Sequence, residues 1–277
     1  MVTVADIGRA ARDLDLSGRP LCVHASLRSF GSVEGGAQAL IDGLLAEGCT
    51  IIVATFSYNE YSEPPPSDLR PARNGSDYAA FGGSSTRRIY RPSSQAIDRT
   101  DIGAIPATVL AMPGRVRGDH PLNSFTAVGP LAEALIVGQS PKNVYAPLAG
   151  IAEADGCVVL MGVSLDKMTL IHLAEKQAGR NLFVRWANGR EGRPRAVLVG
   201  GDSDGFVKLE PVLATLCQER RVGDSLWRVF PAAATLAAAT QAIRDNPKIT
   251  HCGDPGCARC RDAILGGPIL DGLELGA

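Results

Sequence analysis

Two apolar strands joined through a glycine-containing loop and a helix constrain this fold more than any other feature of the chain. LCVHASL at 21–27 is a short apolar run typical of a buried strand, and the glycine- and serine-rich RSFGSVEGG at 28–36 follows it directly. AQALIDGLLAEG at 37–48 has helical spacing, and CTIIVATFSY at 49–58 is a second strand. A helix between two strands indicates a parallel pair, so we predict an α/β fold with a largely parallel central sheet flanked by helices.

Residues 59–100 differ from this pattern, because they are polar and rich in proline, glycine and serine. This segment is either a surface insertion or disordered loop, or an excursion that acts as a lid or binds substrate. We find no internal repeat and no linker. We therefore predict one domain over 1–277, with an inserted long loop at 59–100 and a small cysteine-rich knob at 251–262.

The rest of the chain alternates between helical and strand patterns. Helices are expected over 3–17, 102–113, 130–138, 169–178 and 231–246, and a strand and turn over 114–129. Further strands are expected over 157–163, 182–189 and 194–201, and the last two of these flank a turn at 189–192.

Charge and cysteine content indicate the compartment and the class of partner. The chain has 28 basic and 29 acidic residues and a net charge of −1, which gives no reason to expect nucleic acid or an anionic membrane as partner. No run of eighteen apolar residues predicts a membrane span, and the N-terminus lacks a secretory hydrophobic region. Seven cysteines without an export signal favour reduced thiols. We predict a cytoplasmic monomer or homodimer.

The stretch MTLIHLAEKQAGR at 168–180 places a hydroxyl, an imidazole and a carboxylate three residues apart, at Thr169, His172 and Glu175. Residues at this spacing share a helix face, and the helix follows a strand, where α/β proteins bind ligands. His172 is a candidate general base, Glu175 its orienting acid, and Thr169 a helix cap or oxyanion donor. The alternative is a plain cap and an ordinary surface histidine–glutamate contact.

Three segments resemble a known family. They are VHASLRSFGSVEGG at 23–36, HPLNSFTAVGPLA at 120–132, and TLIHLAE at 169–175, which follows the strand VVLMGV. In this order they are similar to signature segments of the aminoglycoside 3-N-acetyltransferase family, and the resemblance covers most of residues 20–180. It implies an α/β sandwich that transfers acetyl from acetyl-CoA to the 3-amino group of the deoxystreptamine ring of aminoglycosides, which confers antibiotic resistance.

The resemblance also implies roles for individual residues. It makes His172 the catalytic histidine, Glu175 its acidic partner and Thr169 the hydroxyl near the thioester. It places Tyr58 and Asn59 near the acceptor. The loop that contacts the pantetheine and pyrophosphate of CoA in the family corresponds here to Leu27, Arg28, Ser29, Phe30 and Gly31, and we add Val33 to this set.

The residues of that loop suit a phosphorylated ligand on their own chemistry as well. Small side chains let the ligand approach the backbone, and Arg28 adds a fixed positive charge. A plain strand-to-helix turn would have the same composition, and the spacing matches no nucleotide-binding motif.

Acceptor recognition is less sharply indicated by the sequence. A polycationic acceptor calls for carboxylates around its site, and Glu60 and Asp202 are candidates. His120 precedes a proline, so it lies outside helical structure and either orders a loop or lies beside the active site. The segment NVYAPLAG at 143–150 departs from the family, which more often has an Asp or a Ser before the proline. This departure concerns the acceptor range more than the reaction.

The stretch HCGDPGCARC at 251–260 contains three closely spaced cysteines. Two cysteines separated by two residues are the usual half of a structural zinc site, and a third strengthens the signal. We predict that Cys252, Cys257, Cys260 and His251 bind a structural zinc ion, with Cys217 as the other candidate for the fourth ligand. The alternatives are a reduced cysteine-rich turn without metal, or a zinc knuckle that binds nucleic acid.

Two other functions are compatible with the same residues. One is acetyl transfer to another amine in a biosynthetic pathway, and the other is a non-catalytic, zinc-containing binding protein. A buried His172–Glu175 pair that opens on a pocket would favour an enzyme, whereas inert packing of the pair would favour a binding protein.

Overall fold

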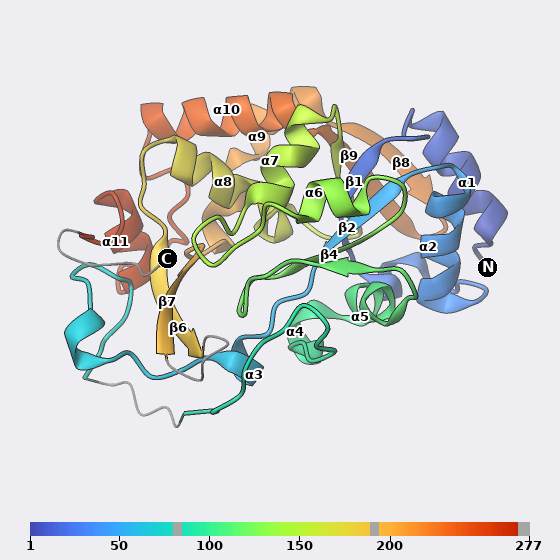
Figure 1. Ribbon diagram of the computed structural model, residues 1–277. Coiled ribbons are helices and arrows are strands. Elements are labelled where there is room, and N and C mark those ends of the chain that lie inside the picture. The colour runs from blue at the N-terminus through green and yellow to red at the C-terminus, as the bar shows by residue number, and fades with distance from the viewer. Residues whose placement is uncertain (80–84, 189–193, 271–277) are drawn as a thin grey trace.

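The computed structural model describes residues 1–79, 85–188 and 194–270, and helices cover both faces of one large sheet (Figure 1). Within these ranges no helix is long and apolar enough to cross a membrane. The strands are β1 (Pro20–Ala25), β2 (Thr50–Ala54), β3 (Val116–Arg117), β4 (Phe125–Val128), β5 (Cys157–Met161), β6 (Phe183–Asn188), β7 (Pro194–Val199), β8 (Gln218–Val222) and β9 (Ser225–Pro231). The α-helices are α1 (Val4–Asp13), α2 (Gly36–Ala46), α3 (Tyr58–Tyr61), α4 (Arg99–Ile102), α5 (Ala104–Ala111), α6 (Ala132–Ile136), α7 (Ala146–Glu153), α8 (Leu170–Gln177), α9 (Glu210–Leu213), α10 (Ala232–Asp245) and α11 (Ala258–Ile264). The 3-10 helices are η1 (Leu27–Phe30), η2 (Ser67–Leu69), η3 (Leu165–Lys167), η4 (Asp204–Leu209) and η5 (Ala214–Leu216).

The central sheet has seven strands in the order β3-β4-β2-β1-β5-β9-β8. β1 pairs in parallel with β2 and with β5. β4 and β9 run antiparallel to this central group, and the edge strands β3 and β8 reverse direction again. All strands of the sheet except β4 and β9 therefore point the same way. This confirms the predicted α/β fold with a largely parallel sheet, although parallel pairing is confined to the three central strands.

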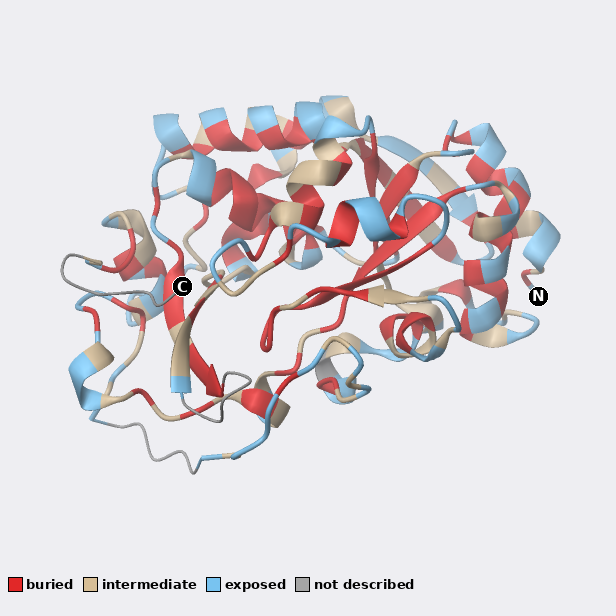
Figure 2. Cartoon of the chain, in the orientation of Figure 1, coloured by how far each residue is buried: buried red, intermediate tan, exposed pale blue. Residues whose placement is uncertain are grey.

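Alternate side chains of the central strands enter two separate hydrophobic cores. In β5, Val158 and Leu160 pack with α6, α7, α8 and α10, whereas Val159 and Met161 pack with α1, α2 and α5 on the other face. A strand covered by helices on both faces must be apolar at every position, which explains the unbroken run CVVLM. Figure 2 shows the central strands buried between the helices.

The inserted segment packs against a second, two-stranded sheet formed by β6 and β7. The buried rings of Tyr61 and Tyr90 meet edge to face with centroids 5.3 Å apart. Isolated bridges join Ser62 to Ala187 and Ile89 to Asn188 of β6. β6 and β7 pair antiparallel as predicted, while the turn predicted at 189–192 lies outside the described residues. The described part of the inserted segment is therefore anchored to the fold, which argues against a disordered loop and leaves a surface insertion and a substrate-binding excursion as the alternatives.

Candidate functional site

A cavity of about 770 Å³ opens at the carboxyl ends of the central strands. Its wall includes His24 and Ala25 at the end of β1, Ala54 at the end of β2, and Val163 just after β5. Ligands of α/β proteins bind at this edge, because parallel strands end there and the loops that follow them diverge. This cavity is therefore the candidate functional site.

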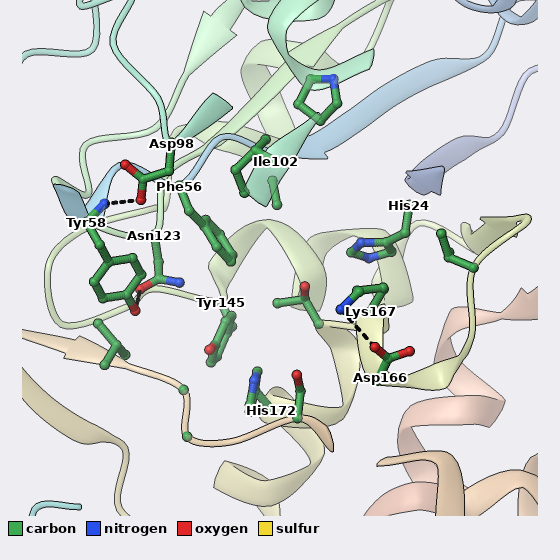
Figure 3. Close-up of a pocket in the computed structure, with 18 of the residues that line it drawn as sticks. His24, Phe56, Tyr58, Asp98, Ile102, Asn123, Tyr145, Asp166, Lys167 and His172 are labelled. Carbon is green, nitrogen blue, oxygen red and sulfur yellow. Dashed lines mark hydrogen bonds and ion pairs between the residues drawn. The ribbon is translucent and has the colours of Figure 1, made fainter. Parts of the chain in front are cut away.

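Polar side chains gather at both ends of the cavity, and His172 lies between them (Figure 3). The arrangement suits a reaction that joins two substrates, since each end can hold one of them beside the same imidazole. The Tyr58 end contains Tyr58, Asp98 and Asn123, and the Lys167 end contains His24, Asp166 and Lys167.

His172 contributes its imidazole to the cavity wall, and a buried carboxylate orients the ring from behind. Its Nδ1 lies 2.9 Å from Oε2 of Glu175, and the two residues are only 8% and 6% exposed. The other oxygen of Glu175 accepts hydrogen bonds from Nη1 of Arg180 and, at 3.2 Å, from Oγ1 of Thr250. A carboxylate only accepts, so Nδ1 of the neutral ring carries the hydrogen and Nε2 is free to take a proton.

Aromatic and backbone groups hold the His172 ring in place. The Tyr145 ring stacks on it with centroids 6.0 Å apart, and the Phe206 ring meets it edge-on at 4.8 Å. Gly200 lies against the same ring, since a Cβ there would be 2.6 Å from its Cγ and Cδ2. The imidazole is thus confined on several sides, as a positioned base requires.

Thr169 lies in the cavity wall at the start of α8, three residues before His172. Its side chain makes no capping hydrogen bond to α8, so a helix cap does not account for it. The structure therefore brings together Thr169, His172 and Glu175 as the spacing predicted.

His24 is the second histidine in the cavity wall. Burial lowers the pKa of His24 to about 4, so this ring is neutral near pH 7 and a much weaker base than an ordinary imidazole. This leaves His172 as the stronger candidate for a general base.

Of the six cofactor-binding candidates at 27–33, all of which the structure describes, none lies in the cavity wall. Phe30 is a core residue that packs edge-on against Trp227, with centroids 6.1 Å apart. The hydroxyl of Ser29 donates to the carbonyl of Ser26 at 2.7 Å, and Val33 bridges to Val2. The side chains of Phe30 and Ser29 and the backbone of Val33 thus have structural partners, and a contact of these residues with CoA stays a prediction. Leu27, Arg28 and Gly31 stay predictions; η1 follows directly from the cavity-lining end of β1.

The acceptor candidates are divided by the structure. Tyr58 and Asn59 lie in the cavity wall, where the hydroxyl of Tyr58 donates to Oδ1 of Asn123. Glu60 instead pairs with Arg88, and neither residue lines the cavity. Asp202 is also outside the cavity wall, because its carboxylate faces the cysteine cluster. The cavity lining thus supports Tyr58 and Asn59 as acceptor contacts and gives no support for Glu60 and Asp202.

His120 is fully buried and orders a loop. Its Nε2 donates to the carbonyl of Leu198 at 2.9 Å, and its Nδ1 accepts from the backbone N–H of Asn123 at 2.8 Å. Both ring nitrogens are occupied and the ring does not line the cavity, so His120 does not contact a substrate there. It acts indirectly, by holding Asn123 at the Tyr58 end.

The burial of His120 predicts a pH dependence of folding. Burial lowers the pKa of His120 to about 3, so the folded chain keeps the ring neutral while the unfolded chain takes up a proton near pH 6.5. The contribution of neutral His120 to the free energy of unfolding is therefore fully present above about pH 6.5 and is lost as the pH falls towards 3. At pH 5 the loss is about 2 kcal/mol relative to neutral pH. Urea unfolding between pH 7.5 and 5 should show this slope together with a similar one from His24, whose pKa burial also lowers, and His120→Gln should remove about half of the total; an unchanged slope would contradict the assignment.

Three cysteines of the C-terminal knob gather around the carboxylate of Asp202. One ligand atom from each of Asp202, Cys252, Cys257 and Cys260 lies within 4.8 Å of the others. His251 is not part of this group, because its Nδ1 accepts from the backbone N–H of Gly253 at 2.9 Å. Asp202 thus occupies the place that the sequence predicted for His251.

Several cavity residues carried no sequence signal that identified them. Asp98 accepts hydrogen bonds from the backbone N–H groups of Tyr58 at 2.7 Å and Asn59 at 3.1 Å, which fixes both at the cavity wall. Tyr145 comes from the start of α7, and burial raises its pKa well above the usual value, so the phenol stays neutral. Asp98, Tyr145, Lys167, Arg185 and Arg259 come from separate parts of the chain, and only the fold brings them together.

The fold and this site define an α/β protein with an oriented histidine at the ligand-binding edge of its sheet. A family model described as aminoglycoside 3-N-acetyltransferase matches residues 22–244. The chain therefore belongs to the aminoglycoside 3-N-acetyltransferase family. It is 34% identical over 185 residues to aminoglycoside N(3)-acetyltransferase VIII of Streptomyces fradiae, in an alignment that covers 62% of this chain but only 60% of that protein.

Solved structures agree with this assignment. A mutant of AAC(3)-IVa in complex with a gentamicin is 25% identical, with a TM-score of 0.74 over 96% of this chain and 97% of that one. AAC-IIIb, solved as a binary complex with CoASH, is 22% identical, with a TM-score of 0.72 over 88% of this chain and 96% of that one. At this identity the second structure supports the fold alone.

Proposed function

We propose that this protein transfers acetyl from acetyl-CoA to the 3-amino group of a deoxystreptamine aminoglycoside. The observation that carries the proposal is the buried His172–Glu175 pair, whose imidazole lies in the wall between the two polar ends of the cavity. Inert packing of the pair would have favoured a binding protein, and the pair instead opens on the cavity. Family membership supports the acyl donor and the acceptor class.

The proposed reaction uses His172 as general base and then as general acid. Nε2 takes the proton from the amine as its nitrogen attacks the thioester carbonyl, and Glu175 stabilises the imidazolium that forms. Thr169 and nearby backbone N–H groups would donate hydrogen bonds to the oxyanion of the tetrahedral intermediate. The C–S bond then breaks, the sulfur receives the proton from His172, and the products are the N-acetyl amide and CoA.

We assign the acceptor to the Tyr58 end and acetyl-CoA to the Lys167 end. Asp98 supplies a carboxylate for a cationic amine, and Tyr58 and Asn123 supply neutral polar groups. Lys167 supplies a cation for an anionic acyl donor, although it also pairs with Asp166 at 2.8 Å. His172 between the two ends would then face both the amine and the thioester.

Turnover of acetyl-CoA, followed as free thiol release, tests the proposal. The assay should use a panel of deoxystreptamine aminoglycosides beside simple polyamines. Release with the aminoglycosides and identification of a 3-N-acetyl product would support the proposed function. Release only with the other amines, or with neither group, would overturn the assignment to aminoglycosides.

Asp98→Asn should weaken acceptor binding and leave the chemical step nearly intact. The amide keeps an oxygen for only one of the two backbone N–H groups that donate to Asp98, and it removes the negative charge near the acceptor, so we expect the aminoglycoside KM to rise about 10-fold. Glu60→Gln is the matched control, because Glu60 pairs with Arg88 outside the cavity wall. Equal effects of both variants on KM would argue against a local role for Asp98.

One observation favours another amine as acceptor. The cavity wall holds three cations, Lys167, Arg185 and Arg259, against the two carboxylates Asp98 and Asp166, so its formal charge is +1 with the histidines neutral. A net positive wall repels a highly cationic ligand. The second candidate function is therefore acetyl transfer to an amine of lower charge in a biosynthetic pathway, which the same panel would reveal.

We also propose zinc as a structural cofactor of the C-terminal knob. Three thiols in a C-x4-C-x2-C stretch form the donor set that zinc prefers in structural sites. None of these thiols lines the cavity, so the metal would have no contact with the reacting groups.

A further inference from the structure

The three cysteines of the C-terminal knob and Asp202 together offer four possible metal ligands. Four ligand atoms, one oxygen and three sulfurs, lie within 4.8 Å of one another. Zinc with bonds of about 2.3 Å to sulfur holds its sulfur ligands about 3.8 Å apart, so small shifts of the side chains would close the site. We propose that Asp202, Cys252, Cys257 and Cys260 bind one zinc ion, with Asp202 rather than His251 as the fourth ligand.

Hydrogen bonds around the cluster orient its donor atoms. The backbone N–H of Cys252 donates to Sγ of Cys260 at 3.2 Å, and the N–H of Cys260 donates to Sγ of Cys257 at 3.5 Å. Such bonds stabilise the negative charge of metal-bound thiolates. Oδ1 of Asp202 accepts from the N–H of Asp204 at 2.9 Å, while Oδ2 lies 3.5 Å from Sγ of Cys257. One carboxylate oxygen is thereby held by the backbone and the other is directed to the metal position.

The four ligands come from two chain segments, and both segments contact the proposed catalytic pair. The segment that carries Asp202 places Gly200 and Phe206 against the His172 ring. The segment that carries the cysteines begins with Thr250, whose hydroxyl bonds to Glu175 at 3.2 Å. A metal ion that joins the two segments would therefore fix the surroundings of the base from both sides.

The same metal would also shape the Tyr58 end of the cavity. Arg259 lies between two ligand cysteines and reaches the cavity wall, as do Gly201 and Ser203 on either side of Asp202. Gly75 of the inserted segment packs on this part of the knob, and its N–H donates to Oδ2 of the buried Asp262 at 2.8 Å. The zinc site is thus a positioning element for the cavity, with no ligand in contact with the substrates.

Metal content and affinity test the site independently of turnover. Purified full-length protein should contain about one zinc ion per chain by mass spectrometry. Competition with a chromophoric chelator measures the zinc affinity, which should be at least 10–100-fold lower in Asp202→Asn than in the native protein. Loss of a hydrogen-bonding partner of a metal ligand already costs this much, and loss of the ligand itself should cost no less. His251→Ala and Asp204→Asn are matched controls and should keep the affinity. Cobalt(II) added to the metal-free native protein should give thiolate-to-cobalt absorption, and Cys257→Ser should reduce it.

Two results would overturn the proposal. Native protein that binds neither zinc nor cobalt has no such site, whatever the variants do. An Asp202→Asn protein with unchanged affinity, or a His251→Ala protein with the larger loss, would exclude Asp202 as fourth ligand. Chelation should also lower kcat about 10-fold or more, with recovery on zinc addition, but this effect rests on the proposed acetyl transfer, whereas metal binding does not. Intact metal binding without transfer would refute the function alone.

Discussion

His172→Ala is expected to lower kcat by about 10²–10⁴-fold, the usual contribution of a positioned general base. The ring is held by Glu175 at 2.9 Å and by the stacked ring of Tyr145, so its Nε2 is directed rather than freely rotating. Alanine removes the proton acceptor, and the neutral ring of His24, with a pKa lowered to about 4 by burial, cannot replace it near pH 7. Steady-state turnover with acetyl-CoA and an aminoglycoside measures the loss.

Acetyl-CoA binding separates a catalytic role of His172 from a structural one. The proposed donor site lies at the Lys167 end, so the dissociation constant for CoA by calorimetry should change less than about 3-fold in the variant. His172→Gln keeps side-chain volume beside Phe206 and serves as the matched control for packing. Full turnover in either variant would show that another group takes the proton.

Glu175 has a structural role as well as an orienting one, which limits its use as a kinetic probe. Its carboxylate pairs with Arg180, and both residues are buried. Removal of one partner of a buried pair leaves the other charge uncompensated, at a cost of about 3–5 kcal/mol. A Glu175 variant would therefore lose stability and activity together, and His172 gives the clearer test.

The core of the fold was predictable because its signals are local. A βαβ unit needs only apolar strands, a turn and a helix in succession, and β1, α2 and β2 confirm it. The antiparallel hairpin of β8 and β9 was not predicted. Most of β8 is exposed at the edge of the sheet, so its sequence QERRV lacks the apolar pattern of a buried strand. Helix α11 was also missed, since it lies inside a stretch interpreted only for its cysteines.

The site divides in the same way between local and distant signals. Thr169, His172 and Glu175 follow one another at intervals of three residues, and the structure brings them together as predicted. Except for Arg180, the groups that contact these side chains come from distant positions such as Tyr145 and Thr250. Their proximity to His172 and Glu175 depends on the whole fold. The metal cluster shows the same limit: adjacency in sequence favoured His251, whereas Asp202 approaches the cysteines from about fifty residues away.

Gly200→Ala is expected to lower kcat/KM by about 100-fold, although residue 200 lies on no helix or strand and carries no reactive group. Gly200 has no positive φ, so alanine is compatible with its backbone and the effect is steric. The added Cβ would lie 2.6 Å from the His172 ring, and ordinary contact distances require a shift of about 1 Å. A misplacement of that size moves Nε2 away from the amine and the thioester. Overpacking should also cost about 1–3 kcal/mol of stability.

Two comparisons isolate the displacement of the ring from general destabilisation. In Gly138→Ala the new Cβ meets only the Cβ of Ala146 at 3.4 Å, so turnover should stay within about 2-fold.

The second comparison uses Tyr145, whose hydroxyl also contacts the new methyl group at position 200. Adding Tyr145→Phe to the Gly200 variant should therefore recover part of the stability but little of the rate, because the clash with the imidazole persists. If the double variant recovered both, the rate loss would come from Tyr145 and not from the position of His172. If Gly200→Ala kept its rate while losing stability, the ring could move without consequence, and close confinement of the imidazole would not be needed for the transfer.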